Sequence, residues 1–329
     1  MIMMYDVITI GSATRDMFLK SRAFEIIESN EGKKYEAIPF GQKFRVDEVA
    51  FASGGGGTNT AVTFARQGLK TACLSIIGDD STGRDIIEEM RLEKVDTSMF
   101  IRHPHLASAF SVILVHPTGE RSILSFKGEG QHFITSEIDF SRLQASLIYV
   151  DSTGGNIEFL NKISEHVKAN NLTMAWNPGG LDIEHGTSGL SDFLNSSKLF
   201  FLNKEEACKL LGVSSLNADI RQVLNKLRGL NSNTIFTITD GKNGSYTIDI
   251  DGSIFYAGIP DSPVIDATGA GDAFASAFTA QYILDADLEK SIKSGVANAS
   301  SVVAHYGAKA GILSKNNFGL LNEIKVQKI

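Results

Sequence analysis

Short apolar runs that each stop at a polar or glycine-containing loop recur along the chain, and this recurrence constrains the fold most strongly. Such runs are typical of strands that are buried on both faces of a parallel sheet. The pattern predicts one α/β domain over residues 1–329, with a mostly parallel central sheet and helices on both faces. The runs that carry this prediction span residues 7–10, 147–151, 173–176, 199–203 and 234–239.

Charge and cysteine usage exclude several classes of function. The 329 residues carry a formal net charge of −7 and no basic run, so we expect no nucleic-acid partner. No apolar run is long enough to span a bilayer, and residues 1–6 lack the basic region of a signal peptide. Cys73 and Cys208 lie in apolar surroundings, which predicts buried thiols rather than a disulfide. We therefore expect a cytoplasmic protein that binds small molecules and no membrane.

The segment 266–272 (DATGAGD) carries the strongest indication of chemistry. Gly269 and Gly271 allow the backbone N–H groups of residues 269–272 to approach an anion closely, and a helix that starts here adds its unpaired N–H groups. Asp272, at the rim of this cradle, could remove a proton from a hydroxyl group while the cradle holds the developing charge. The alternative is a tight turn in which Asp272 only caps the helix.

The same segment resembles the C-terminal signature of the PfkB sugar kinases, which have the ribokinase-like fold. The resemblance implies a three-layer α/β fold and transfer of a phosphoryl group from ATP to a hydroxyl group. By this resemblance Asp272 is the catalytic base, and the backbone of Gly269, Ala270 and Gly271 forms the anion hole with it. Ala267 departs from the family pattern, where a hydroxyl residue is common at this position.

Residues of the N-terminal third are candidates for binding the phosphate acceptor. Asp16 follows the first predicted strand, where ligands bind in open α/β sheets; a loop carboxylate without such a role is the alternative. Residues 53–60 (SGGGGTNT) open a helix, so backbone amides and the Asn59 amide group could contact a polyhydroxyl ligand. A flexible loop before a helix is the other interpretation. The family resemblance implies that Asp16, Gly54, Gly55 and Asn59 bind the acceptor.

Asn203 and Glu206 stand three residues apart at the junction of a strand and a helix. Their residue types alone favour a capping box, which recurs at many helix starts. The resemblance implies a second role, in which Glu206 organises Mg²⁺ through water and Asn203 contacts the nucleotide. Magnesium keeps several waters and takes phosphate oxygens as ligands, so a single carboxylate suffices.

The resemblance implies further contacts along the chain. Thr239, Gly241 and Asn298 match positions near the nucleotide, together with Gly269 and Gly271. It also suggests a monovalent cation, K⁺, near Asp266. Residues 15–50 and 98–130 contain short alternating segments and a hairpin around residues 116–120, which we expect to form a small β lid. In this family such a lid often supports a homodimer.

These observations predict an ATP-dependent kinase of a sugar or similar polyol. A nucleoside kinase is the first alternative, with Phe40, Phe44 or Phe110 around a purine, and a phosphosugar acceptor would use Arg102 or Arg121. A non-catalytic sugar or nucleotide sensor on the same scaffold is the alternative from another class. A dinucleotide-dependent oxidoreductase is disfavoured, because residues 11–15 lack the spaced glycines of a Rossmann turn.

Overall fold

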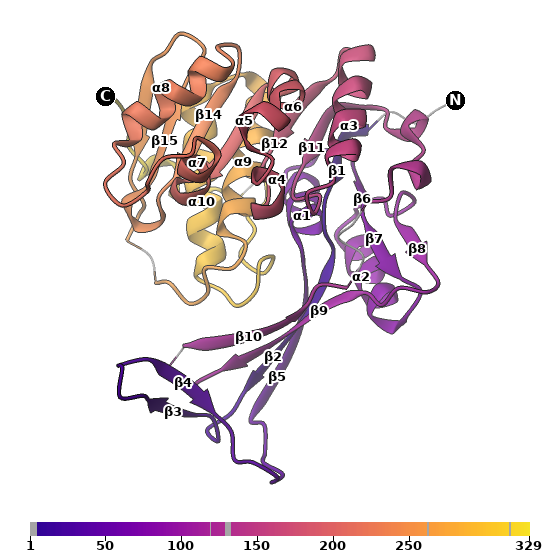
Figure 1. Cartoon of the computed structure of the whole chain (residues 1–329), viewed down its shortest axis with the longest axis vertical. Coiled ribbons are helices and arrows are strands. Elements are labelled where there is room, and N and C mark those ends of the chain that lie inside the picture. The colour runs from indigo at the N-terminus through magenta and orange to yellow at the C-terminus, as the bar shows by residue number, and fades with distance from the viewer. Residues whose placement is uncertain (1–4, 119, 129–132, 262, 316) are drawn as a thin grey trace.

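The computed structural model describes residues 5–118, 120–128, 133–261, 263–315 and 317–329. Within these ranges a large sheet of nine strands runs through the body of the molecule (Figure 1). The six strands from β6 to β14 are parallel to their neighbours, and β15 to β17 are antiparallel, which confirms the mostly parallel sheet. In spatial order the strands are β17 (Val326–Lys328), β16 (Ile254–Ala257), β15 (Ser245–Ile248), β14 (Ile235–Thr239), β13 (Leu199–Asn203), β12 (Thr173–Trp176), β11 (Ala145–Val150), β1 (Tyr5–Ile10) and β6 (Thr71–Leu74).

Helices cover both faces of this sheet because successive strand residues point to opposite sides and both sets are apolar. Phe201 packs with Phe274 and Phe278 on one face, and Phe200 packs with Trp176 and Phe236 on the other. The first face carries α1 (Gly56–Arg66), α9 (Ala270–Asp285) and α10 (Leu288–Val303), and the second carries α3 (Ile157–Ala169), α6 (Ser191–Ser196), α7 (Lys204–Leu210) and α8 (Ile220–Leu230). The other helices are α2 (Ser81–Leu92), α4 (Gly180–Ile183) and α5 (Gly186–Gly189), with 3₁₀ turns at Thr135–Glu137, Phe140–Arg142, Gly241–Asn243 and Gly319–Asn322.

A second, four-stranded sheet projects from the body (Figure 1). Its strands β9 and β10 are antiparallel partners, which confirms the hairpin predicted around residues 116–120; Gly119 itself lies outside the described residues. We call it the small sheet, and its spatial order is β10 (Arg121–Phe126), β9 (Ala109–Val115), β2 (Thr14–Lys20) and β5 (Glu48–Gly54). Two further pairs are β3 (Glu25–Glu28) with β4 (Lys34–Ala37), and β7 (Ile76–Gly78) with β8 (Ile101–His103).

The register of the small sheet gives it two unlike faces. Asp16 pairs with Ser111 on β9 and with Ala52 on β5, so these side chains share one face. We call it the inner face, and its side chains on β2 and β9 are mostly buried, whereas Ile123 on β10 is 52% exposed. The neighbouring positions Phe51 and Phe110 lie on the opposite, outer face, where they are 57% and 41% exposed.

Candidate active site

The start of α9 has the backbone shape that the glycines of residues 266–272 predict. Gly269 is the residue before the helix and has a φ of 75°, in the left-handed region. A Cβ at this position would overlap the side chain of Ala308, so close packing also demands glycine. This turn places Gly271 and Asp272 at the first turn of α9, both on the wall of a cavity.

The amide groups of this turn are available for a ligand. Ala270 donates to the Ala267 carbonyl at 3.3 Å, and Ala273 donates to the Gly269 carbonyl at 2.8 Å. Between them, the N–H groups of Gly271 and Asp272 have no acceptor in the part of the chain that the structure describes. Unpaired backbone N–H groups at the N-terminus of a helix favour the binding of an anion, because they can donate hydrogen bonds to it and the helix dipole attracts negative charge.

The Asp272 carboxylate accepts hydrogen bonds from two amide side chains. Asn59 Nδ2 lies 2.8 Å from Oδ2, and Asn177 Nδ2 lies 3.4 Å from Oδ1. Burial raises the pKa of Asp272, while the Asn59 hydrogen bond and the positive charge of Lys309 oppose that rise. The carboxylate is therefore held in one orientation at the cavity wall.

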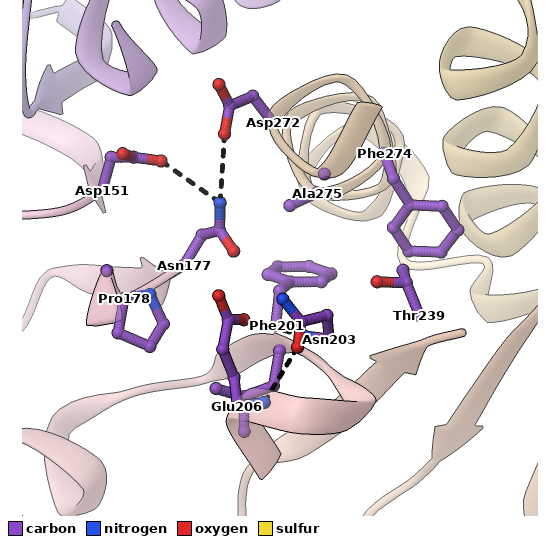
Figure 2. A pocket seen from close by; sticks show the side chains of 13 residues that line it. Asp151, Asn177, Pro178, Phe201, Asn203, Glu206, Thr239, Asp272, Phe274 and Ala275 are labelled. Atoms are coloured by element: carbon purple, nitrogen blue, oxygen red, sulfur yellow. Dashed lines mark hydrogen bonds between the residues drawn. The ribbon is translucent and has the colours of Figure 1, made fainter. Parts of the chain in front are cut away.

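A second carboxylate, Asp151, lies beside Asp272 and was not among the predicted site residues. The Asn177 amide group bridges the two, with Nδ2 3.2 Å from Asp151 Oδ2 (Figure 2). Burial and the Asp272 charge raise the pKa of Asp151 well above its ordinary value. Because the Asn59 hydrogen bond and the Lys309 charge act on Asp272 and favour its ionised form, we assign the proton of this pair to Asp151 and the negative charge to Asp272. A carboxylate at the end of a buried strand was the available sequence signal.

Asn203 and Glu206 form the capping box and also line the cavity. The Glu206 amide donates to Asn203 Oδ1 at 2.8 Å, and the Asn203 amide donates to Glu206 Oε2 at 2.9 Å. The capping box and a ligand-binding role are therefore compatible, because the two hydrogen bonds of the box do not use Glu206 Oε1 or Asn203 Nδ2. The cavity of about 250 Å³ lies between this box and the Asp151–Asp272 pair (Figure 2).

The residues of this cavity fit a magnesium ion that arrives with a nucleotide. Burial raises the pKa of Glu206, and the Asp272 charge adds to the rise, so a cation here would be stabilising. The described residues contain no cluster of three or more His, Cys, Asp or Glu side chains able to hold a metal alone. Mg²⁺ takes most of its ligands from water and phosphate, so this donor set is sufficient for it.

A second, mostly apolar cavity of about 240 Å³ adjoins the first. Thr239, Gly271 and Phe274 line both cavities, and Gly241 and Ala270 line the second. An elongated ligand with one apolar and one anionic end could therefore occupy both. The side chains that complete the apolar wall include Ile259, Val264, Val296, Ala299 and Val303.

Asn298 corrects one sequence expectation. Its side chain is fully buried, with Nδ2 donating to the Ala273 carbonyl and Oδ1 accepting from the Leu313 amide, both at 2.8 Å. These bonds occupy both ends of the amide group, so it ties α9 and α10 to the C-terminal segment instead of facing a nucleotide. Its neighbours Ala299 and Ser300 line the second cavity.

The candidate acceptor residues lie in one continuous group. The glycine at 54 is required because a Cβ there would overlap the Asp16 carboxylate, and Gly55, with a φ of 94°, precedes α1. Burial raises the pKa of Asp16, opposed by its hydrogen bond with Ser111. Asn59 is 4% exposed, and its Oδ1 has no hydrogen-bond partner among the described residues. A buried acceptor without a partner favours a ligand that donates a hydrogen bond, such as a hydroxyl group.

The environment of Asp266 does not fit the potassium ion that the resemblance suggested. Its carboxylate is 1% exposed and accepts from the Thr268 and Gly307 amides at 2.9 and 3.1 Å. Arg121 Nη2 lies 2.8 Å from Oδ1. A potassium ion needs oxygen ligands, whereas this carboxylate already faces N–H donors and a guanidinium that would repel a second cation.

The candidates for other acceptors lie away from the cavities. Phe40 is fully exposed, Phe44 packs edge-on against Phe24, and Phe110 lies on the outer face, so these phenylalanines form no purine sandwich around the described cavities. Arg102 lines a surface hollow beside α2. Arg121 is engaged by Asp266 and is therefore not a free phosphate contact.

Lys309 is a buried group that the sequence pattern did not single out. Its Nζ donates to the carbonyl and hydroxyl of Ser53 at 2.7 and 2.8 Å and to the Thr58 hydroxyl at 2.9 Å. Burial lowers the pKa of Lys309 to about 8. The ammonium group therefore joins the end of β5 to the start of α1, where the candidate acceptor residues lie.

Comparisons with known proteins agree with this arrangement. Residues 6–315 match the model of the pfkB family carbohydrate kinases. A ribokinase of Staphylococcus aureus is 26% identical over 313 residues, which cover 93% of this chain and 96% of that protein. A nucleoside kinase of Methanocaldococcus jannaschii is 24% identical over 259 residues, or 79% and 82% of the two chains.

Solved structures show the same fold. The Arabidopsis thaliana ribokinase complexed with ribose and ATP superposes with a TM-score of 0.78 at 19% identity, covering 97% of this chain and 99% of that one. This confirms the predicted ribokinase-like α/β fold. Among the described residues, no helix combines the length and the apolar character needed to cross a bilayer.

Proposed function

Because the chain belongs to the PfkB family of carbohydrate kinases, which transfer phosphoryl groups to hydroxyl groups, we propose that it uses ATP to phosphorylate a sugar or a closely related polyol. The observation that carries this proposal is the pairing of free Gly271 and Asp272 amides with the oriented Asp272 carboxylate. An anion cradle beside a proton acceptor is the arrangement that forming a phosphate ester requires.

The roles of the residues follow from their positions. Asp272 accepts the proton of the attacking hydroxyl group, and the free Gly271 and Asp272 amides hold the charge that develops on the transferring phosphoryl group, whereas the predicted Ala270 amide is bonded to the Ala267 carbonyl. Thr239 and Gly241, with the apolar wall of the second cavity, bind the nucleoside part of ATP. Asn203 and Glu206 face the phosphates, and a magnesium ion held near Glu206 through water would neutralise phosphate charge.

The acceptor is a sugar in this proposal because its predicted contacts are polar. Asp16 supplies a buried carboxylate, and Asn59 supplies a carbonyl oxygen without a partner. Gly54 and Gly55 allow backbone to approach the ligand closely. A nucleoside acceptor is less well supported, since the three candidate phenylalanines lie away from the cavities.

We also propose that two copies pair through the outer face of the small sheet. An apolar patch can pair with itself across a two-fold axis, whereas a patch of one charge repels its copy. The exposed side chains of the outer face are Val49, Phe51, Phe110, Leu124 and Phe126.

A panel of sugars, sugar phosphates and nucleosides, assayed for ATP consumption and for product mass, tests the proposed function. We expect turnover with at least one unphosphorylated sugar or polyol and none with nucleosides. Turnover with nucleosides alone would assign the alternative acceptor. Ligand binding without phosphoryl transfer across the whole panel would instead favour a sensor.

A further inference from the structure

The Arg121–Asp266 ion pair joins the small sheet to the loop of the proposed active site. Asp266 begins the segment that forms the anion cradle, and Arg121 is the first residue of β10. The same guanidinium lies 3.5 Å from the Thr268 hydroxyl, so it contacts the loop at two positions. Thr268 directly precedes Gly269, the residue whose left-handed conformation shapes the cradle.

Register explains how Arg121 reaches this loop. It pairs with Val115 on β9, and Val115 pairs with Lys20 on β2, which places all three on the inner face with Asp16. A side chain at this position points toward the body of the molecule and away from the exposed outer face. The packing of the small sheet against the body therefore places the Arg121 guanidinium beside the cradle. The Arg121 side chain is 27% exposed there.

The charge balance of the loop gives Arg121 a function beyond packing. Asp266 is a buried carboxylate near the site where ATP phosphates are proposed to bind, and its charge also acts on Asp16. Without a cation it would repel both the phosphates and Asp16. Arg121 supplies a permanent positive charge, since a guanidinium does not lose its proton in proteins.

From this we infer that Arg121 is a positioning residue that supplies a built-in cation to the phosphoryl-transfer loop, so that catalysis needs no monovalent metal ion. The inference rests on the proposed kinase function. It makes the order of the cradle depend on the docking of the small sheet against Asp266. The inference also predicts no potassium dependence, contrary to what the family resemblance suggested. Both carboxylate oxygens of Asp266, which a potassium ion would need as ligands, already accept hydrogen bonds from Thr268, Gly307 and Arg121.

The test compares the wild-type chain with Arg121→Ala and Arg121→Lys in potassium, sodium and choline chloride at equal ionic strength. Arg102→Ala is the matched control, because it removes the same charge from an exposed strand position away from the loop. We expect wild-type and Arg102→Ala activity to be equal in the three salts. Arg121→Ala should lose about 10- to 100-fold in kcat in choline, and Arg121→Lys less. Potassium should restore part of the Arg121→Ala loss.

Two outcomes would overturn the inference. The first is strong stimulation of the wild-type chain by potassium, and the second is an Arg121→Ala defect that is equal in all salts or absent. Melting temperature and ADP affinity in the same salts give a readout that needs no turnover. Potassium should raise both for Arg121→Ala and leave the wild-type values unchanged. If the wild-type chain transfers no phosphoryl group to any acceptor, the proposed function fails, and these binding data alone decide the role of Arg121.

Discussion

The large sheet and the small sheet bury their residues in different ways. Strands β1, β11 and β13 are buried on both faces, because helices cover each side. The small sheet buries mainly the β2 and β9 side chains of its inner face, and apolar side chains remain exposed on its outer face. A strand buried on both sides holds its carboxyl end in a fixed position, which suits residues that must be placed accurately.

The two sheets contribute different residues to the proposed site. Asp151, Asn177 and Asn203 end or follow strands of the large sheet, and Asp272 begins a helix packed on it. The small sheet contributes Asp16 and Arg121 from its inner face. Residues proposed to handle the phosphoryl group therefore belong mainly to the large sheet and its helices. The proposed acceptor residues come from both, with Asp16 and Gly54 on the small sheet and Asn59 on α1, and the proposed contact with a second copy belongs to the small sheet.

The largest expected effect comes from the large-sheet side, with Asp272→Asn. Loss of a general base should lower kcat by about 10²- to 10⁴-fold, with ADP affinity unchanged in calorimetry. Asp151→Asn is the matched control, because it replaces a carboxyl group that we assign as protonated by a neutral group of the same shape. Its kcat should fall by about tenfold at most. A larger loss for Asp151→Asn than for Asp272→Asn would show that the proton was assigned to the wrong member of the pair.

A smaller effect is expected where the two sheets join, at Lys309. Lys309→Met leaves the buried oxygens of Ser53 and Thr58 without their donor, so the free energy of unfolding should fall by about 2 kcal/mol at pH 7. Urea titrations measure this change. Lys226→Met, on the exposed face of α8, is the control and should change it by at most about 0.5 kcal/mol.

The pH dependence of this effect has a definite sign. The folded-state pKa of Lys309 is about 8, below its ordinary value of 10.5, so between these values the unfolded chain binds the extra proton. The free energy of unfolding of the wild-type chain should therefore rise, relative to Lys309→Met, as pH increases through this window. A difference that stays constant from pH 7 to pH 10 would show that folding does not lower the pKa of Lys309.

The sequence predicted those features whose structure is determined by residues close to one another along the chain. The continuous apolar runs of the strands indicated a sheet buried on both faces, and residues 266–272 indicated the cradle, because its glycines act within one turn. The proximity of Asp272 to Asn59 could not be derived from spacing, since 213 residues separate them. It was implied only through the family resemblance.

The residues that prediction missed, or to which it gave another role, are those whose partners are distant in the sequence. Lys309 binds Ser53 across 256 residues, and no local motif surrounds it. Arg121 resembles an ordinary strand cation until the register of β10 places it opposite Asp266. Asn298 lies in the expected region, but its rotation on α10 directs the amide group inward to Ala273 and Leu313.

The smallest effect on activity is expected on the outer face of the small sheet. If two copies pair there, Phe51→Glu buries a charge in an apolar interface and should raise the dimer dissociation constant at least about tenfold, or 1.4 kcal/mol. Sedimentation at several concentrations measures this, with a wild-type mass of roughly twice 35.5 kDa as the reference. Because Phe51 faces away from Asp16, kcat should change by about twofold at most.

Leu216→Glu separates the interface from a general effect of added charge. Leu216 is 86% exposed and lies between α7 and α8, on the large-sheet side of the molecule. It should leave the dimer intact, because its surface takes no part in the proposed contact. A monomeric wild-type chain, or equal dissociation by both variants, would contradict pairing through the outer face. The exposed side chains of that face would then need another explanation, since an apolar patch of this kind usually marks a contact surface.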